Sequence, residues 1–225
     1  MLREFIQAWR CSKCEALCKA IDEFSAMIGD AEWAFTHAWA SFAGETLPEE
    51  NRQAIVDRDI GINKHERAIR RLLVEHLSIN PGRDVPGCLA LMSIAKDAER
   101  IGDYSKNIFA LPTMLKGPGC ELKYMKRLAA VEENVVKNFP KLHKAYQDSD
   151  NTLATQILGT YAPIKEACSK ILADLFSDDL PTRESVTTAL VAAYLRRINS
   201  HMGNIASGII YPLDRIDFVQ DDRNE

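Results

Sequence analysis

The sequence predicts an all-α protein of six helices, arranged as two tandem three-helix bundles. Three observations support this prediction. Apolar residues recur every three or four positions along several long segments, which is the spacing of one helix face. Clusters rich in glycine, proline and small polar residues separate these segments. The third helical segment is also similar to the sixth, which indicates that a three-helix unit was duplicated.

The breaks between the segments set the expected limits of the helices. They lie at residues 44–48, 80–86, 112–119, 148–152 and 177–181. Between them we expect the first, second, fourth and sixth helices at about residues 2–43, 48–77, 121–147 and 183–210. The third helix should end near Pro112, and the fifth should precede the break at residues 177–181. Pro140 and Pro163 fall inside the fourth and fifth helices, where proline should kink or split a helix.

The repeat divides the chain into a first unit at residues 1–115 and a second unit at residues 118–225. The third and sixth helices align through Arg100-Ile101 on Arg197-Ile198 and through Asn107-Ile108 on Asn204-Ile205. The acidic positions change in the second copy: Glu99 falls on Arg196, Asp103 on Ser200 and Tyr104 on His201. We therefore expect no carboxylate-rich site in the second unit. The Arg196–Arg197 pair remains open to three interpretations: a partner for an internal acid, an anion site or an ordinary surface pair.

Acidic residues in the first unit form two stripes that can meet. Glu99 and Asp103 are four residues apart, so their side chains share one helix face. Asp59, Asn63 and Glu66 form a similar stripe on the preceding helix. The short turn at residues 80–86 predicts that these two helices are adjacent and antiparallel. Facing carboxylates favour a hard divalent cation or basic side chains between them, although each stripe alone is also compatible with a solvated helix flank.

Two segments of the first unit resemble a known family. The run Glu99-Arg100-Ile101-Gly102-Asp103-Tyr104, followed by Asn107-Ile108, is similar to the signature of the PhoU family of phosphate-uptake regulators. The segment Asp59-Ile60-Gly61-Ile62-Asn63-Lys64-His65-Glu66 resembles the family's Asp-x-x-Val-Asn-x-x-Glu segment, with Ile62 in place of valine. The resemblance is specific in the first half of the chain and degenerate in the second.

The resemblance implies a cytoplasmic accessory or regulatory protein of phosphate transport. It implies that paired acidic motifs bind iron, zinc, manganese or magnesium, with these residues as the expected ligands: Asp59, Asn63, Glu66, Glu99 and Asp103. It also implies two partners, a phosphate transporter at the membrane and a phosphate-sensing histidine kinase. A homodimer is expected from the long first helix and its tryptophans. In this interpretation the bound metal fixes a docking surface rather than supporting catalysis.

The composition excludes several kinds of partner and cellular location. The 225-residue chain has a formal net charge of −4 and no long basic run, so we expect no nucleic-acid partner. The longest apolar run, at residues 189–195, is too short to span a bilayer, and charged residues interrupt the N-terminal segment where a signal peptide would be apolar. Six cysteines without a secretion signal indicate reduced thiols, including the helical series Cys11, Cys14 and Cys18.

No catalytic motif accompanies the acidic stripes. None of the five histidines has a glutamate three residues before it, and the sequence contains no phosphate-binding loop or nucleophile elbow. We therefore expect no enzyme activity. The alternatives are a metal-dependent phosphohydrolase or oxidase on a four-carboxylate helical site, and a metal-free interaction module whose acidic stripe pairs with lysine and arginine.

Overall fold

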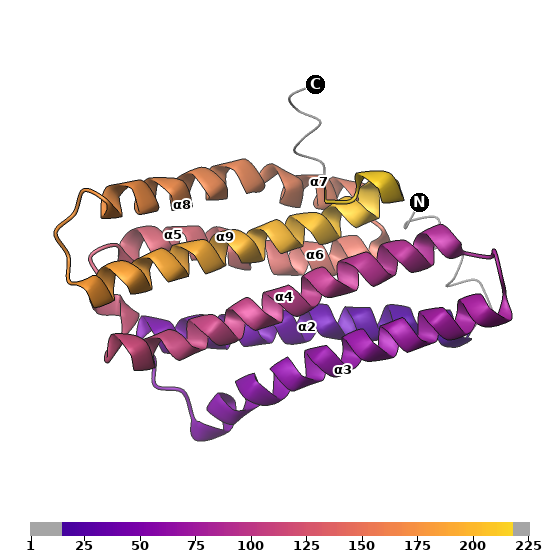
Figure 1. The fold of residues 1–225 in the computed structure, drawn as a ribbon, viewed down its shortest axis with the longest axis horizontal. Coiled ribbons are helices and arrows are strands. Elements are labelled where there is room, and N and C mark those ends of the chain that lie inside the picture. Colours follow the sequence, from indigo (N-terminus) through magenta and orange to yellow (C-terminus); the bar gives the residue numbers. More distant parts are fainter. Residues whose placement is uncertain (1–14, 218–225) are drawn as a thin grey trace.

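The structure is a computed structural model that describes residues 15–217. This part of the chain forms eight α-helices and two short 3-10 helices, without strands (Figure 1). The helices are α2 (Glu15–Ala43), α3 (Glu49–Ile79), α4 (Val85–Leu115), α5 (Met125–Val136), α6 (Asn138–Asp148), α7 (Asn151–Gly159), α8 (Tyr161–Leu175) and α9 (Thr182–Ile210), and the 3-10 helices are η1 (Gly119–Glu121) and η2 (Leu213–Arg215). The all-α prediction is confirmed. Residues 2–14 of the expected first helix, with Trp9, Cys11 and Cys14, lie outside the described residues.

The helices run along a common long axis and form an elongated bundle (Figure 1). In the first half, α2, α3 and α4 pack against one another. In the second half, α9 packs against each of α5, α6, α7 and α8. The two halves meet mainly through α4 and α9, and also through α2 and α6. Helix α3 lies at one outer edge of the bundle and α8 lies at the opposite edge (Figure 1).

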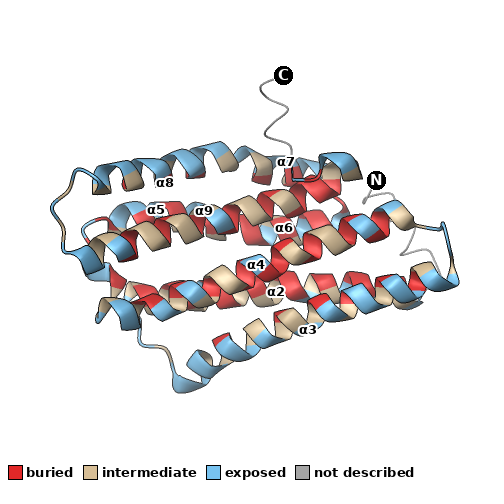
Figure 2. Cartoon of the chain, in the orientation of Figure 1, coloured by how far each residue is buried: buried red, intermediate tan, exposed pale blue. Residues whose placement is uncertain are grey.

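The buried faces of these helices form one hydrophobic cluster that includes residues from both halves. Figure 2 shows this buried layer running through α2, α4, α6 and α9, whereas α3 and α8 expose most of their outer sides. The largest fully buried aromatic side chains of the cluster, Phe24, Phe35, Phe42, Phe139 and Tyr146, are each at most 1% exposed. Burying such a side chain contributes roughly 1.5–3 kcal/mol to folding. The division at residues 115–118 stays a prediction.

Both expected proline kinks are present, each three residues before the proline. The chain breaks at Lys137 before Pro140, and at Thr160 before Pro163. The breaks precede the prolines because the proline ring clashes with the carbonyl four residues earlier and offers no N–H to it. The fourth and fifth expected helices are therefore observed as the pairs α5–α6 and α7–α8.

A buried polar cluster joins the two kinks to α9. The amide of Asn138 donates to the Thr160 hydroxyl at 2.9 Å and to Oδ1 of Asn199 at 3.0 Å. The Thr160 hydroxyl lies 3.2 Å from the same Asn199 oxygen. Asn138 and Asn199 are almost fully buried, so these hydrogen bonds offset part of the cost of removing two amides from water, while Oδ1 of Asn138 has no hydrogen-bond partner among the described residues.

The turn between α3 and α4 has the position that the sequence predicts. Helix α3 continues two residues past its expected end at residue 77, and α4 begins at Val85 after Asp84, whose φ of 59° is left-handed. Pro86 occupies the first turn of α4, where its missing N–H has no helical partner to lose. No helix between residues 15 and 217 is long and apolar enough to cross a membrane.

Candidate functional site on helices α3 and α4

The five predicted site residues lie on two helices that pack against each other. Asp59, Asn63 and Glu66 belong to α3, and Glu99 and Asp103 belong to α4. The helices approach closely at this level, since a Cβ atom built on Gly102 would lie 2.8 Å from Cδ1 of buried Ile62. Glycine at this position therefore allows the two acidic stripes to flank one contact between α3 and α4.

A lysine bridges the two helices at the centre of the acidic stripes. Nζ of Lys106 donates to both carboxylate oxygens of Asp59, at 2.9 Å and 2.8 Å. The same nitrogen lies 3.4 Å from Oδ1 of Asp103 on its own helix. Partial burial lowers the pKa of Lys106, but the hydrogen bond and charge of Asp59, with those of Asp103, outweigh it and raise this pKa above its usual value. One positive charge thus holds two carboxylates of facing helices together.

The two glutamates are buried and also have basic partners. Glu66 is 5% exposed and accepts a hydrogen bond of 2.7 Å from Arg70, one turn further along α3. Glu99 is 8% exposed and accepts a hydrogen bond of 2.7 Å from Lys96. Arg100 lies 3.7 Å from the same Glu99 oxygen. A buried carboxylate without such a partner would be strongly destabilising, so these pairs account for the charged side chains at this depth.

The remaining two site residues have weaker constraints. Asp103 accepts a second hydrogen bond, of 3.1 Å, from Arg100 at the solvent side of the pair. The Asn63 amide donates to the backbone oxygen of Asp59 at 2.9 Å, one turn earlier in α3. Asn63 therefore points along its own helix, whereas Asp59 reaches across to α4.

The oxygen ligands fit a hard cation chemically, but their present partner is an ammonium group. Among residues 15–217, no three histidine, cysteine, aspartate or glutamate side chains are grouped closely enough to hold a metal ion. Binding of a metal ion by Asp59 and Asp103 would therefore require Lys106 to move away. The Lys106 side chain is 40% exposed, which leaves it room to do so.

The basic partners are the part of the site that the sequence prediction did not name. Lys106 follows Asp103 by three residues and Arg70 follows Glu66 by four, which are spacings at which side chains meet on a helix. That signal was present in the sequence. The reach of Lys106 to Asp59 was not, because it depends on how α3 and α4 are rotated against each other.

In the second half, the residues that replace the acidic motif connect α9 to α4. Asp97 is 6% exposed and lies 2.7 Å from Nδ1 of His201, and it accepts a hydrogen bond of 2.8 Å from Asn204. The Tyr104 ring contacts the rings of His201 and Tyr194 at centroid distances of 5.8 Å and 5.6 Å. Under the repeat alignment, Asp97 matches Tyr194 and Tyr104 matches His201. The Asp97–His201 and Tyr194–Tyr104 contacts are thus equivalent, and the degenerate motif contributes to the interface between the halves.

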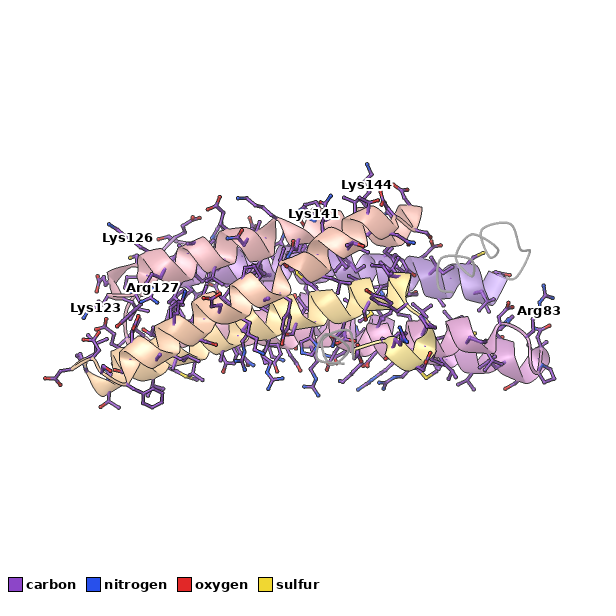
Figure 3. The ribbon with its side chains drawn as sticks, turned by 90° about the horizontal axis from the view of Figure 1, so that it is seen from above. Arg83, Lys123, Lys126, Arg127, Lys141 and Lys144 are labelled. Carbon is purple, nitrogen blue, oxygen red and sulfur yellow. The ribbon has the colours of Figure 1, made fainter. Side chains whose placement is uncertain are left out.

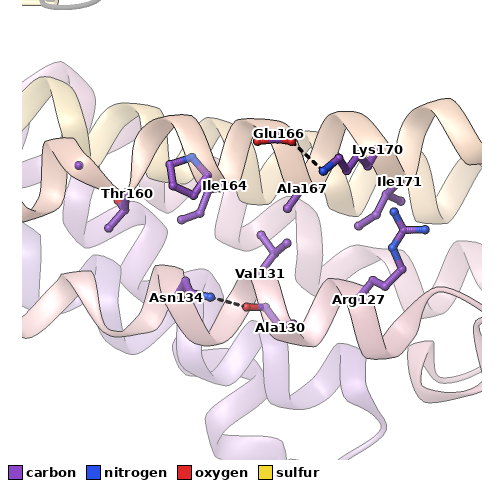
Figure 4. Close-up of a pocket in the computed structure, with 12 residues that line it drawn as sticks. Arg127, Ala130, Val131, Asn134, Thr160, Ile164, Glu166, Ala167, Lys170 and Ile171 are labelled. Atoms are coloured by element: carbon purple, nitrogen blue, oxygen red, sulfur yellow. Dashed lines mark hydrogen bonds and ion pairs between the residues drawn. The ribbon is translucent and has the colours of Figure 1, made fainter.

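A separate surface groove of about 590 Å³ lies between α5 and α8, away from the acidic residues (Figure 4). Its walls are mostly small and apolar, with Val131 and Ala130 on α5 facing Ile164 and Ala167 on α8. The charged residues at its edge are already paired, Lys170 with Glu166 at 2.7 Å and Arg127 with Asp174. None of the predicted site residues lines this groove.

Taken together, the fold and the site define a class of protein: an all-α bundle that presents paired charged residues along two adjacent helices. Comparisons with known proteins show which family the site-bearing part of the chain is similar to. The PhoU domain family matches residues 24–111, which include all five site residues. The match lies in the first half of the chain, where the acidic motif is intact, and the motif is degenerate in the second half.

Related proteins and structures agree with this match. The chain is 26% identical over 179 residues to a phosphate-specific transport system accessory protein PhoU homolog in each of two strains of Xylella fastidiosa. These matches cover 76% of this chain and 74% or 72% of the relatives. The fold is similar to that of the phosphate transport system regulatory protein PhoU from Streptococcus pneumoniae, with a TM-score of 0.68 and 18% identity over 89% of this chain and 93% of that one. PhoU from Pseudomonas aeruginosa matches with a TM-score of 0.67 and 21% identity over 94% and 96%.

Proposed function

We propose that this protein is a cytoplasmic accessory protein that regulates a phosphate transport system by docking rather than by catalysis. The relatives from Xylella fastidiosa carry that role in their names, and they align with three quarters of this chain. The observation that carries the proposal is the intact acidic motif of the PhoU domain, which lies across the contact between α3 and α4. Its proposed partners are a phosphate transporter at the membrane and a phosphate-sensing histidine kinase.

The arrangement of the acidic residues favours docking over catalysis. Each carboxylate of the site contacts a lysine or arginine, so its oxygens are already engaged in an ion pair within the protein. A general acid or base needs a pKa close to the working pH and access to a substrate. The paired residues instead form a fixed charge pattern, which is suited to selecting a partner.

The proposal includes a divalent metal ion bound in place of the Lys106 ammonium. Asp59, Asn63, Glu66, Glu99 and Asp103 would supply its oxygen ligands, and iron, zinc, manganese and magnesium are the candidates. The ion would add positive charge that pulls α3 and α4 together. Without the metal ion, the Lys106 ammonium supplies the positive charge. The site could therefore exist in a metal-bound state and a lysine-bound state that differ in surface charge.

Metal content tests this part of the proposal. We would measure it by plasma mass spectrometry on untagged protein, comparing wild type with Glu99→Ala/Asp103→Ala and with Lys106→Met. The expected result is bound metal in wild type, more in Lys106→Met because the competing ammonium is gone, and none in the double variant. Metal-free protein in all three samples, after incubation with each candidate ion, would remove the metal and leave the metal-free interaction module.

The role itself is tested in the organism that encodes the chain. Deleting the gene should change phosphate uptake or the expression of a phosphate-starvation reporter, and a plasmid copy should restore it. Affinity purification from membranes should recover the phosphate transporter with the tagged chain. A deletion that leaves uptake and reporter unchanged at both low and high phosphate would contradict the proposed role.

Light scattering on the purified chain tests the proposed homodimer.

Turnover of phosphate esters separates the docking proposal from an enzyme. Purified protein loaded with each candidate metal should show no hydrolysis of a generic phosphomonoester above the background of the metal alone. Hydrolysis that follows metal loading and disappears in Asp59→Ala/Asp103→Ala would favour a metal-dependent phosphohydrolase instead.

A further inference from the structure

The outer side of α3 carries a stripe of basic and aliphatic side chains. Three cations occupy its middle and three aliphatic residues flank them, and all six recur at helical spacing on one face. The aliphatic residues are unusually open to solvent, with Val56 40%, Ile60 48% and Val74 55% exposed. We call this set the α3 outer stripe; its six residues are Val56, Ile60, Lys64, Arg67, Arg71 and Val74.

The three cations of the stripe have no ion-pair partner among residues 15–217. Lys64, Arg67 and Arg71 are exposed, and together with Arg70 they line a shallow depression of about 480 Å³. Arg70 differs because it pairs with Glu66 of the acidic site. The unpaired cations contrast with those of the α3–α4 site, where every lysine and arginine described above contacts a carboxylate.

The position of α3 makes the stripe accessible to a flat partner. Helix α3 contacts α2 and α4 on its inner side and lies at the outer edge of the bundle (Figure 1). It is 31 residues long, and the stripe from Val56 to Val74 spans about 27 Å at the rise of an α-helix. The exposed acids Asp57 and Glu75 lie to one side of the stripe, and no acidic residue falls within it.

We propose that the α3 outer stripe seats the protein on an anionic lipid surface. The three cations would contact lipid phosphates, while the valine and isoleucine side chains at both ends reach the boundary of the acyl chains. Lysine and arginine can contact headgroups while their aliphatic stems stay in the less polar layer. This contact is direct and does not depend on the transporter or kinase proposed above, so it can be tested without them.

Other occupants fit the stripe less well. A second copy of the chain, docked symmetrically, would bring the same three cations against each other. The core of a protein interface is enriched in aromatic residues, whereas α3 contains no phenylalanine, tyrosine or tryptophan. The mixture of exposed aliphatic residues with cations is typical of helices that lie in a membrane interface.

A second basic region supplies a matched control. Lys126 on α5 and Lys141 and Lys144 on α6 lie along one edge of the view in Figure 3, on helices of the second half that pack against α9. They equal the stripe in number of charges but do not share a single helix face. Two other labelled cations of that region, Lys123 and Arg127, are paired with Asp178 and Asp174. Neutralising the three lysines changes the net charge of the protein as much as neutralising the stripe does.

The test is co-sedimentation of the full chain with vesicles. One set contains phosphatidylglycerol and phosphatidylcholine in equal amounts, and the other contains phosphatidylcholine alone. We would compare wild type with a charge variant (Lys64→Gln/Arg67→Gln/Arg71→Gln), an apolar variant (Val56→Ser/Ile60→Ser/Val74→Ser) and a control (Lys126→Gln/Lys141→Gln/Lys144→Gln). All changed residues except Lys141 are exposed, so the fold should persist, which circular dichroism checks.

The expected result is binding of wild type and control to the anionic vesicles only. Each lost cation should weaken partitioning about fivefold, hence roughly a hundredfold for the charge variant. The apolar variant should also bind measurably less. Three outcomes would overturn the proposal: no binding of wild type, equal loss in the control, or release by inorganic phosphate at matched ionic strength, which would indicate a free-anion site. Absent vesicle binding would assign the stripe to an acidic protein partner.

Discussion

Replacing Lys106 by methionine removes the positive charge between α3 and α4 while keeping the length of the side chain. In the wild-type protein this ammonium contacts Asp59 at 2.8 Å and Asp103 at 3.4 Å. The two carboxylates are 15% and 27% exposed, so water screens their charges only in part. The substitution therefore leaves two partly buried like charges facing each other. We expect the Lys106→Met protein to be less stable than wild type.

The structure sets the size of this effect. Contacts of 2.8 Å and 3.4 Å to one nitrogen leave the carboxylates at most about 6 Å apart, where two unit charges repel by about 3 kcal/mol at an effective dielectric constant of 20. Solvent reaches all three side chains, and Arg100 still contacts Asp103, so we reduce the expected loss to about 1–2 kcal/mol.

Urea denaturation at low salt measures this loss. Wild type, Lys106→Met, Asp59→Asn and the double variant form a thermodynamic cycle, and Asp59→Asn should recover most of the stability that Lys106→Met loses. A loss that Asp59→Asn fails to recover would refute the electrostatic role of Lys106.

Further predictions concern the helix packing and one half-buried acid, Glu132. Gly29→Ala should stabilise α2 by about 1 kcal/mol, because a Cβ at that position meets nothing within 4 Å. Gly102→Ala should not give this stabilisation, because its Cβ would clash with the Ile62 side chain. The midpoints of urea denaturation compare the two variants. Burial, with the nearby Glu133 charge, raises the pKa of Glu132 to about 7, so the folded state retains this proton more tightly than the unfolded chain and stability falls as the pH rises from about 4.5 through 7. Glu132→Gln should therefore raise the melting temperature at pH 8 but not at pH 4; an equal rise at both pH values would contradict the pKa assignment.

The helical spacing of apolar residues and the breaks rich in glycine and proline were enough to predict the helices. The apolar stripe of α3 that the sequence indicates, Ile55, Ile62, Ile69 and Leu73, is at most 1% exposed in the structure. Local sequence also places the turn at residues 80–86 and the two proline kinks. It does not give the polar cluster of Asn138, Thr160 and Asn199, because that cluster depends on how three helices meet after they kink.

The acidic residues of the site could be found from spacing, but their partners could not all be found in this way. Short-range partners such as Arg70 follow from helix geometry alone. The contact from Lys106 to Asp59 joins residues 47 positions apart, and the contact from His201 to Asp97 joins residues 104 positions apart. Such contacts depend on the rotation and axial offset of packed helices, which the one-dimensional pattern leaves undetermined.

The most direct test of the proposed function is the rate of radiolabelled phosphate uptake in cells that lack the gene. Complementation with wild type should restore the regulated rate at high external phosphate. Complementation with Asp59→Ala/Asp103→Ala, expressed at the same level, should not, whereas a control with two exposed acids changed, Asp57→Ala/Glu133→Ala, should restore it. Full restoration by the Asp59→Ala/Asp103→Ala protein would contradict the claim that the acidic site between α3 and α4 carries the function.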